Sequence, residues 1–583
     1  MKPSIDHLRT GRIASALIAL ALLGGCQKKT DDLAGYRKVE VANIVTPTIV
    51  NPNFADGTTG WSVGPGYTAA PGQGFNQTGA LMYERTDPEA YALATQTIAL
   101  SPGVNYRFSA MIRCEGVEGA DASGASVAIE YHKNGQWLGG VYPMGVKGTS
   151  DWTQVKGMAL LPDDADSCRF VLYMRKGLTG KAWFTKATVE PLNRSADAHL
   201  LRPVQERFLT NDGHFTLRWG VSGDLGKDAG GKSLKTRVEI RAGDKVVKLE
   251  RFDCNNLVTE GDLGSLPEGE FTLRAALLDP EAKTILGEAE FPVTCVNPSN
   301  IPATAVRVDA KGRTYVDGKP FLPVGLFLHG IDREMLKEIS ASPFNCVMPY
   351  GSLGLAFENT SKQGAERTRE VLDACAAANV KVIYSIKDLY EAELVGGHGG
   401  WRGSWNGIKG EKEVVTAIVE SFRDHPALLA WYTSDEVPSI EAPRLTERRR
   451  LVRALDPWRP SWAVHCHIVE IDDLCTVSDV AGIDPYPINK VDSRDMAYVD
   501  RFASRTRTAL AGDGGGLPLW VVPQAHNTAL YRVAADGKRL DRLENREELL
   551  AKSRAPSEEE MRSMSLLQAI QGARGFVFYS YFD

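Results

Sequence analysis

Strand-like and helix-like segments alternate along residues 305–583. Short apolar runs bounded by glycine, proline or polar residues are typical of buried parallel strands, and longer amphipathic stretches are typical of helices. The predicted strands are Leu322–Leu328, Phe344–Pro349, Val380–Ile386, Leu428–Thr433, Ser461–His465, Asp479–Ile483, Leu519–Val522 and Gly575–Tyr579. The predicted helices include Ala365–Ala378, Glu411–Phe422, Arg444–Ala454, Met496–Ala511 and Glu558–Ala573. This order predicts an α/β fold, a (βα)8 TIM barrel. No helix follows the eighth strand, so either the barrel closes without one or the chain is truncated.

Residues 46–300 carry a different pattern, in which short alternating strands are separated by glycine turns. Between residues 46 and 192, strands such as Tyr106–Ile112 and Ala125–Tyr131 occur without a helical stretch, which predicts a β-sandwich. A second set between residues 202 and 296 predicts an immunoglobulin-like β-sandwich. We therefore expect three folded domains, at residues 46–194, 195–300 and 301–583.

The N-terminus has the pattern of an export signal. Lys2, Arg9 and Arg12 precede an apolar run at residues 13–23, which is too short to span a bilayer and ends in L-G-G-C at Cys26. The pattern resembles a bacterial lipoprotein signal peptide. The resemblance implies that residues 1–25 are removed and that Cys26 is lipidated, with residues 26–45 as a tether. Gln27 follows where aspartate would indicate inner-membrane retention, so we expect a lipid anchor in the bacterial outer membrane.

Composition narrows the classes of function and partner. The chain has 583 residues and a net charge of −6, and no basic run suggests a nucleic-acid partner. Eight cysteines follow Cys26, and an exported location permits disulfides. Cys114 could pair with Cys168, and Cys254 with Cys295, because each pair falls within one predicted β domain. Spacing alone does not determine the connectivity.

The stretch 427–438, A-L-L-A-W-Y-T-S-D-E-V-P, turns from apolar to acidic at Asp435 and Glu436. Either carboxylate could simply cap the following helix. In a parallel barrel, however, side chains just past the strand ends converge on one face, where carboxylates and aromatic rings suit a polyhydroxylated substrate. The positions that share this placement are His329, Tyr350, Asp388, Asp435, Glu436, His465, His467, Asp484, Tyr486, Gln524, His526, Tyr579, Tyr581 and Asp583.

Several of these motifs, in this order, resemble the clan A glycoside hydrolases of the family 2, 5 and 42 type. They are D-G-K-P-F-L-P-V-G at residues 317–325, H-P-A-L-L-A-W-Y-T-S-D-E-V-P, D-V-A-G-I-D-P-Y-P at residues 479–487, P-L-W-V-V-P-Q-A-H and the run E-E-M-R-S-M-S to F-V-F-Y-S-Y. The resemblance implies a retaining hydrolase with an acid/base glutamate after strand four and a nucleophilic glutamate after strand seven. Glu436 matches the acid/base position, with Asp435 where asparagine is usual. Gln524 stands where the nucleophile is expected.

Because glutamine cannot act as a carboxylate nucleophile, three interpretations stay open. A different carboxylate, such as Asp484, Asp388 or Asp583, could supply the second group, with an inverting outcome at a separation of about 6.5–9.5 Å. Alternatively, a group of the substrate could attack, with Gln524 orienting it. Finally, the barrel could bind sugar without catalysis. In the catalytic interpretations, Asp435 and Asp484 are the main candidates to partner Glu436, and Gln524, Tyr486, His465, His526 and Asp388 would bind substrate.

The first β domain resembles the carbohydrate-binding modules of families 4, 9 and 22. The resemblance rests on N-P-N-F-A-D-G-T-T-G-W at residues 51–61, Y-R-F-S-A at residues 106–110 and D-W-T-Q-V at residues 151–155. Sugar rings stack on exposed aromatic faces. Candidates for this stacking are Tyr67, Tyr83, Tyr91, Trp137 and Tyr142. Trp137 lies in a predicted turn, so we expect it to be the most exposed of these candidates. Trp61 and Trp152 are expected in the core.

Two other patterns have weaker implications. The sequence His465-Cys466-His467 would place two imidazoles on one face of a strand, but no carboxylate accompanies them at ligand spacing. We therefore expect no metal, and no motif indicates a cofactor. Trp401 and Trp405 lie in a glycine-rich loop after strand three and could either wall a substrate subsite or anchor the loop as buried indoles.

Together these patterns predict an exported, lipid-anchored glycoside hydrolase-like protein that hydrolyses O-glycosidic bonds of a poly- or oligosaccharide. The alternative is a non-catalytic carbohydrate-binding lipoprotein with a degenerate barrel. A purely structural surface protein is a third possibility.

Overall fold

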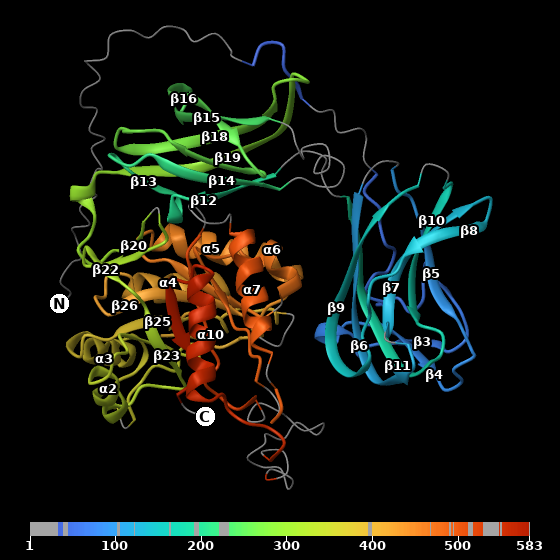
Figure 1. Ribbon diagram of the computed structural model, residues 1–583. Helices are drawn as coiled ribbons and strands as arrows, with labels where there is room; N and C mark the ends of the chain where they lie inside the picture. Colours follow the sequence, from blue (N-terminus) through green and yellow to red (C-terminus); the bar gives the residue numbers. More distant parts are fainter. Residues whose placement is uncertain are drawn as a thin grey trace, which may run out of the picture.

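Figure 1 shows the computed structural model of the chain. It describes residues 33–38, 45–101, 105–121, 123–162, 165–191, 197–220, 233–309, 311–358, 360–394, 399–466, 468–488, 491–493, 495–510, 517–528, 547 and 551–581. Cys26 and the expected signal peptide lie outside these residues, as do His467 and Asp583. Within the described ranges, no helix is long and apolar enough to cross a membrane.

Two antiparallel five-stranded sheets form the first β region. One has the strand order β2-β5-β10-β7-β8 and the other β3-β4-β11-β6-β9. Alternating apolar side chains of both sheets share one core, in which the rings of Phe108 and Phe170 lie 6.4 Å apart. The strands are Ser62–Val63 (β2), Tyr67–Ala70 (β3), Ala80–Arg85 (β4), Leu93–Ile98 (β5), Asn105–Gly119 (β6), Ala125–Lys133 (β7), Gln136–Val141 (β8), Gly148–Leu160 (β9), Ser167–Met174 (β10) and Leu178–Pro191 (β11).

The second β region contains a six-stranded and a three-stranded sheet around another core, which includes Leu217, Val238 and Leu273. Its main strands are Asp197–Arg202 (β12), Arg207–Leu209 (β13), His214–Gly220 (β14), Leu234–Ala242 (β15), Lys245–Cys254 (β16), Val258–Asp262 (β17), Gly269–Asp279 (β18) and Thr284–Val296 (β19). A short strand from the expected tether, Arg37–Lys38 (β1), pairs in parallel with β19 at the sheet edge. Part of the tether is therefore attached to this sheet.

Eight parallel strands close into a barrel, as the alternating pattern predicted. They are Val324–Leu328 (β23), Cys346–Pro349 (β24), Lys381–Ser385 (β25), Leu428–Asp435 (β26), Ser461–His465 (β27), Val480–Ile483 (β28), Leu519–Val521 (β29) and Gly575–Phe578 (β30). A small sheet of Val306–Val308 (β20), Thr314–Val316 (β21) and Lys319–Phe321 (β22) leads into it. Pairing of β23 with β30 completes the closure of the barrel.

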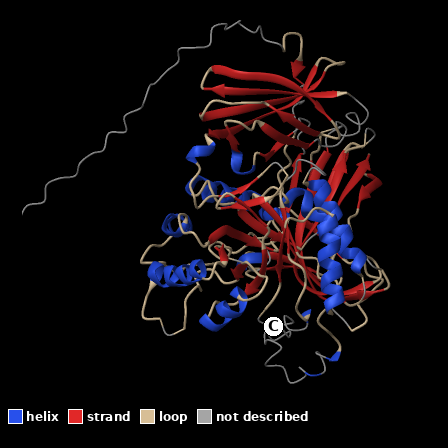
Figure 2. Cartoon of the chain, turned by 60° about the vertical axis from the view of Figure 1, so that its left-hand side comes forward, coloured by secondary structure: helices blue, strands red, loops and turns tan. Residues whose placement is uncertain are grey.

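Helices cover the outside of the barrel, and Figure 2 shows them gathered around its strands. They are Arg333–Ser340 (α2), Gly364–Ala377 (α3), Glu411–Phe422 (α4), Ala442–Leu455 (α5), Ile471–Leu474 (α6), Met496–Ala509 (α7) and Glu558–Ile570 (α10). Side-chain caps mark the starts of some of them. Asp332 caps α2, and Ser557 and Glu560 form a reciprocal capping box at α10.

Large aromatic side chains fill the centre of the barrel. The ring of Trp462 lies 5.9 Å from Phe327, 5.1 Å from Tyr432 and 6.0 Å from Trp520. All four side chains are buried. The barrel is therefore packed through its middle, and space for a ligand remains only near the strand ends.

The eight cysteines among the described residues are all free thiols. Cys114 donates to the carbonyl of Val146, and Cys295 donates to the carbonyl of Leu266. Neither the Cys114–Cys168 pair nor the Cys254–Cys295 pair, which the sequence allowed, forms a disulfide. Burial raises the pKa of Cys114 to about 12, which keeps the thiol protonated and unreactive.

Candidate functional site

The acidic end of β26 lies at the centre of the site. Every residue from Leu428 to Asp435 is buried, and the chain then turns at Glu436, which has a left-handed backbone with φ of +49°. The amide of Glu436 donates to the carbonyl of Val464 at 2.9 Å, which ties this turn to the neighbouring strand β27. The turn leaves the Glu436 side chain partly exposed while Asp435 stays buried.

Two phenols hold the Asp435 carboxylate. The Tyr350 hydroxyl donates to Oδ2 at 2.5 Å, and the Tyr432 hydroxyl donates to Oδ1. These two hydrogen bonds fix the position of the Asp435 carboxyl group at the end of the strand. Burial and the charge of Asp435 raise the pKa of Tyr350, so its phenol remains a donor.

Asp484 follows β28 and is 4% exposed. Burial raises the pKa of Asp484 well above the usual carboxyl range, and the charge and hydrogen bond of Glu436 raise it further. Two carboxyl groups in hydrogen-bond contact retain a proton between them, because both cannot be charged in a buried site without a large cost. Glu436 and Asp484 therefore form a proton-sharing pair.

These carboxyl groups open onto one pocket of about 330 Å³. Its wall is largely aromatic. The ring of Tyr486 lies 4.7 Å from His526 and 6.2 Å from Tyr579, and Phe327 lies 5.1 Å from Tyr579. The residues that line the pocket are Phe327, Tyr350, Asp435, Glu436, Val464, Asp484, Tyr486, Val522, His526, Thr528 and Tyr579. The pocket thus combines acidic groups with ring faces at the carboxyl ends of the strands.

Seven of the strand-end positions predicted from the sequence line this pocket, namely Tyr350, Asp435, Glu436, Asp484, Tyr486, His526 and Tyr579. The ring of His526 is held by a contact of 3.0 Å between its Nδ1 and the carbonyl oxygen of Tyr579. Burial and the charges of Asp484 and Glu436 raise the pKa of Tyr486, which therefore remains a neutral phenol.

Gln524 lies at the expected strand-seven position but does not line the pocket. Its Oε1 accepts from the amide of Ile488 at 3.0 Å, and its Nε2 donates to the carbonyls of Ile488 at 2.6 Å and His526 at 3.1 Å. The side chain is completely buried. Its amide therefore joins the loops after β28 and β29, and no part of it faces the pocket.

Three more of the expected substrate contacts lie outside the pocket lining. His465 is buried at the end of β27, and Asp388 accepts from the amide of Ser352 at 3.1 Å and from Lys387 at 2.8 Å. Trp401 packs half-buried against the apolar cluster between barrel and helices. Trp405 is 7% exposed in the same cluster, as expected for an indole that anchors the loop.

The structure adds residues to the site that the strand-end rule did not identify. Tyr432 lies within β26, and its hydroxyl reaches Asp435 from inside the barrel. Alternation along β26 could have indicated this inward position, since neighbouring Trp431 packs outward against the helices. Lys387 is nearly buried, with its ammonium 3.9 Å from the centre of the Tyr350 ring. No local motif indicated Lys387 or Thr528.

Trp137 is the most exposed aromatic side chain of the first β region, at 59%. Its Nε1 donates to the Tyr142 hydroxyl at 3.1 Å, and that hydroxyl donates to Glu130 at 3.0 Å. Its exposure matches the prediction from the turn context. In contrast, Tyr67 and Tyr83 stack on each other and are buried, so they are not available to a sugar. Trp61 is buried as expected, and Trp152 is partly buried.

Within the described ranges, no group of three or more histidine, cysteine, aspartate or glutamate side chains could hold a metal ion. Of the two histidines in the His465-Cys466-His467 motif, His465 lies within the described ranges and His467 lies outside them.

Residues 46–179 match a protein-family model described as a carbohydrate binding domain. No curated protein matches the chain in sequence. Solved structures similar to the chain include a protein described as a beta-galactosidase from Bacteroides fragilis, with 10% identity, a TM-score of 0.30, and coverage of 85% of this chain and 72% of that one. A Bacteroides uniformis beta-glucuronidase has 11% identity, a TM-score of 0.30 and coverage of 85% and 59%. A Ruminococcus gnavus beta-glucuronidase has 10% identity, a TM-score of 0.31 and coverage of 84% and 82%. The domain match supports a carbohydrate-active protein.

The raised pKa of Asp484 predicts a pH-dependent stability difference between the wild type and Asp484→Asn. A carboxyl group whose folded pKa is raised stabilises the fold below its unfolded pKa, and that stabilisation is lost as pH rises through the folded pKa. Asparagine does not titrate. The unfolding temperature of the variant, relative to wild type, should therefore increase from pH 4 to pH 8 in thermal denaturation. Glu420→Gln, on an exposed face of α4, serves as the control. A difference that does not change with pH would contradict the protonation of Asp484.

Proposed function

We propose that the barrel hydrolyses O-glycosidic bonds of a poly- or oligosaccharide. The observation that carries this proposal is the convergence of Asp435, Glu436 and Asp484 on one aromatic-walled pocket. Glycoside hydrolysis needs one carboxyl group to protonate the leaving oxygen and a negative group near the positively charged anomeric centre. Rings such as Tyr486 and Tyr579 offer faces to a sugar. The carbohydrate-binding domain in the same chain supports a glycan substrate.

The proton-sharing pair supplies the acid. Asp484 holds a proton beside Glu436, and Glu436 is the partly exposed member of the pair, so Glu436 transfers the proton to the leaving oxygen and later recovers one from water. One oxygen of Asp484 is buried, and no described residue hydrogen-bonds it, so its charged form is poorly solvated. The pair thus acts as general acid and then general base.

Asp435 supplies the second carboxylate. Its two oxygens already accept hydrogen bonds from Tyr350 and Tyr432, which weakens Asp435 as a nucleophile but fixes its position beside the pocket. Asp435 therefore stabilises positive charge at the anomeric carbon, and the attacking group is water or a group of the substrate itself. Gln524 orients the loops around this centre rather than the substrate.

On this proposal the barrel is a (βα)8 TIM barrel of the clan A type, and the first β region is a jelly roll that binds the glycan. The ring of Trp137, with Tyr142 and Glu130 beside it, would form a stacking platform on β8 and the segment that follows it. The lipoprotein pattern supports export, lipidation at Cys26 and attachment to the outer membrane.

Glu436→Gln should lower the hydrolysis rate about 10²- to 10⁴-fold, because a general acid–base group contributes about that much. The assay measures released reducing sugar on a panel of glycans and aryl glycosides. Glu420→Gln makes the same chemical change on the outer face of α4 and should leave the rate unchanged.

Equal activity of Glu436→Gln and wild type would disprove this site. If the wild type cleaves no glycan but retains glycans, the non-catalytic binding alternative is correct. If it neither cleaves nor retains them, a structural role is correct.

Trp137→Ala should weaken retention on a matching polysaccharide about three- to tenfold in affinity electrophoresis, since an aromatic stack contributes about 0.5–1.5 kcal/mol. Leu138→Ala removes the neighbouring side chain, which is 40% exposed, and should leave retention unchanged. Equal losses in both variants would exclude a specific stacking role for Trp137.

Cys26→Ala should move the protein from the membrane fraction to the soluble fraction of an expressing bacterium and abolish incorporation of labelled palmitate. Both changes follow from losing the thiol that would carry the lipid. A variant that still incorporates label would refute lipidation at Cys26.

A further inference from the structure

We propose that the first β region positions the catalytic Glu436 through Lys156, which acts as a positioning residue on the segment that follows β26. This inference rests on the proposed function, because it assigns Lys156 a role in the same reaction. Lys156 belongs to β9, far from the barrel in sequence, and it does not line the pocket. Its influence on catalysis would therefore pass entirely through the chain that carries Glu436.

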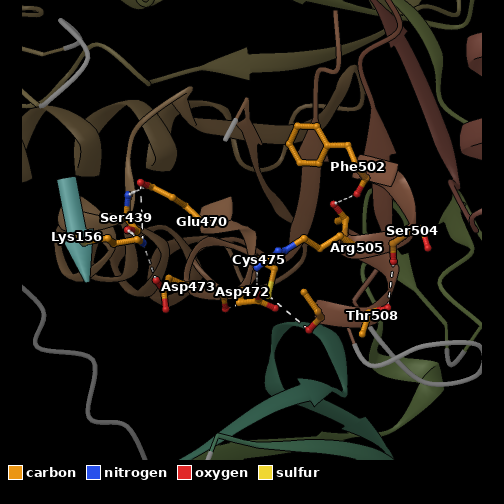
Figure 3. A network of polar contacts seen from close by, with 12 residues as sticks. Lys156, Ser439, Glu470, Asp472, Asp473, Cys475, Phe502, Ser504, Arg505 and Thr508 are labelled. Atoms are coloured by element: carbon orange, nitrogen blue, oxygen red, sulfur yellow. Dashed lines mark hydrogen bonds and ion pairs between the residues drawn. The ribbon is translucent and has the colours of Figure 1, made fainter. Parts of the chain in front are cut away.

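The Lys156 side chain contacts three residues of the barrel domain. Its ammonium donates to the Ser439 hydroxyl at 3.0 Å and to Oδ2 of Asp473 at 3.3 Å, and it lies 3.9 Å from Oε1 of Glu470. Figure 3 shows Lys156 extending from its strand toward Ser439 and Glu470, with Asp473 beside it. The Lys156 side chain is 25% exposed and that of Glu470 is 9% exposed. Partial burial makes such a cluster stronger than an exposed ion pair.

Ser439 is the point at which these contacts meet the catalytic segment. It comes three positions after Glu436 and begins the short helical turn Ser439–Glu441. The amide of Ser439 donates to Oε2 of Glu470 at 2.6 Å, so Glu470 accepts from the backbone while Lys156 holds the hydroxyl. Val437 and Pro438 lie between, both buried, and proline fixes its own backbone angle φ. Because the backbone between them has little freedom, a displacement of Ser439 should also displace Glu436.

A second lysine from the same β region approaches the same turn. Lys186, in β11, lies within electrostatic range of Glu441, which is 6% exposed and accepts from Arg444 at 3.1 Å. Burial lowers the pKa of Lys186, and the charge of Glu441 opposes that shift, as expected for an ammonium at a domain contact. On the other side, Arg107 lies 3.4 Å from Asp473. The first β region therefore places Lys156, Lys186 and Arg107 near this turn and the adjacent helix α6.

The other end of the catalytic segment is attached to the barrel. The amide of Glu436 bonds to Val464, and Glu436 contacts Asp484. Glu436 thus lies between a fixed barrel strand and a turn held by another domain. Without Lys156, Asp473 and Glu470 lose a neutralising cation and Ser439 loses its donor, so the turn can move. Misplacement of an acid by a fraction of an ångström lowers the rate without removing substrate contacts.

The test compares Lys156→Met, Lys156→Arg and a control, Lys181→Met, in the full-length protein. Lys181 also lies in the first β region but pairs with Glu84 of that region. Lys156→Met should lower kcat about tenfold with KM on a short aryl glycoside nearly unchanged. Lys156→Arg keeps the charge and should restore kcat to within about threefold of the wild type. Lys181→Met should match the wild type.

Hydrogen–deuterium exchange provides a readout that does not depend on activity. Lys156→Met should increase exchange in the peptide that covers residues 436–441, while exchange in α4 stays at the wild-type level. Unchanged exchange there, or a KM that rises as much as kcat falls, would overturn the positioning role. If the wild type cleaves no glycan, the proposed function fails, and the exchange alone then decides whether Lys156 orders this segment.

Discussion

The site depends on one constraint, which is the crowding of acidic side chains at the ends of β26 and β28. Glu436 and Asp484 are in contact in a buried place, so one proton must stay between them. The barrel imposes this contact, because β26 and β28 both pair with β27 and their ends cannot separate. A third carboxylate, Asp435, is tolerated because the phenols of Tyr350 and Tyr432 solvate it. Local chain geometry thus determines which carboxyl groups are crowded together and which is hydrogen-bonded by phenols.

The barrel interior, the loops at its strand ends and the two β regions each contribute differently to the site. The barrel interior is packed with aromatic rings, so it serves as a rigid base and leaves the chemistry to the strand ends. The loops after β28 and β29 are joined by the amide of Gln524. Both β regions contact the barrel around the short helix α6: Lys156 reaches Asp473, and Arg218 donates to the carbonyl of Asp472. The polar face of one short helix therefore links all three folded regions.

Much of the fold could be predicted from the sequence, because periodicity reports burial directly. Ser461–His465 and Glu411–Phe422 were predicted with the bounds that the structure has, and the other barrel strands differ by a few residues. Asp435 and Asp484 could be predicted as site residues for the same reason, since they lie at the ends of buried apolar runs.

Side-chain direction within loops was not predictable. Gln524 was expected to face a substrate, but three backbone groups in nearby loops take its amide, a choice that depends on loop paths. Asp388 and Trp401 follow strand three as expected, yet neither lines the pocket, because a neighbouring loop and an apolar cluster hold them. The absence of disulfides among the described cysteines likewise depends on thiol separations across sheets, which spacing in the sequence does not specify.

If Cys26 carries the proposed lipid, the pairing of β1 with β19 limits how far the protein can extend from a membrane. Arg37 follows Cys26 by eleven positions, and an extended chain advances at most about 3.6 Å per residue. With the proposed lipid on Cys26, the second β region would remain within about 40 Å of the bilayer surface. A tether of this length would favour glycans that have already reached the cell surface over polymers at a distance.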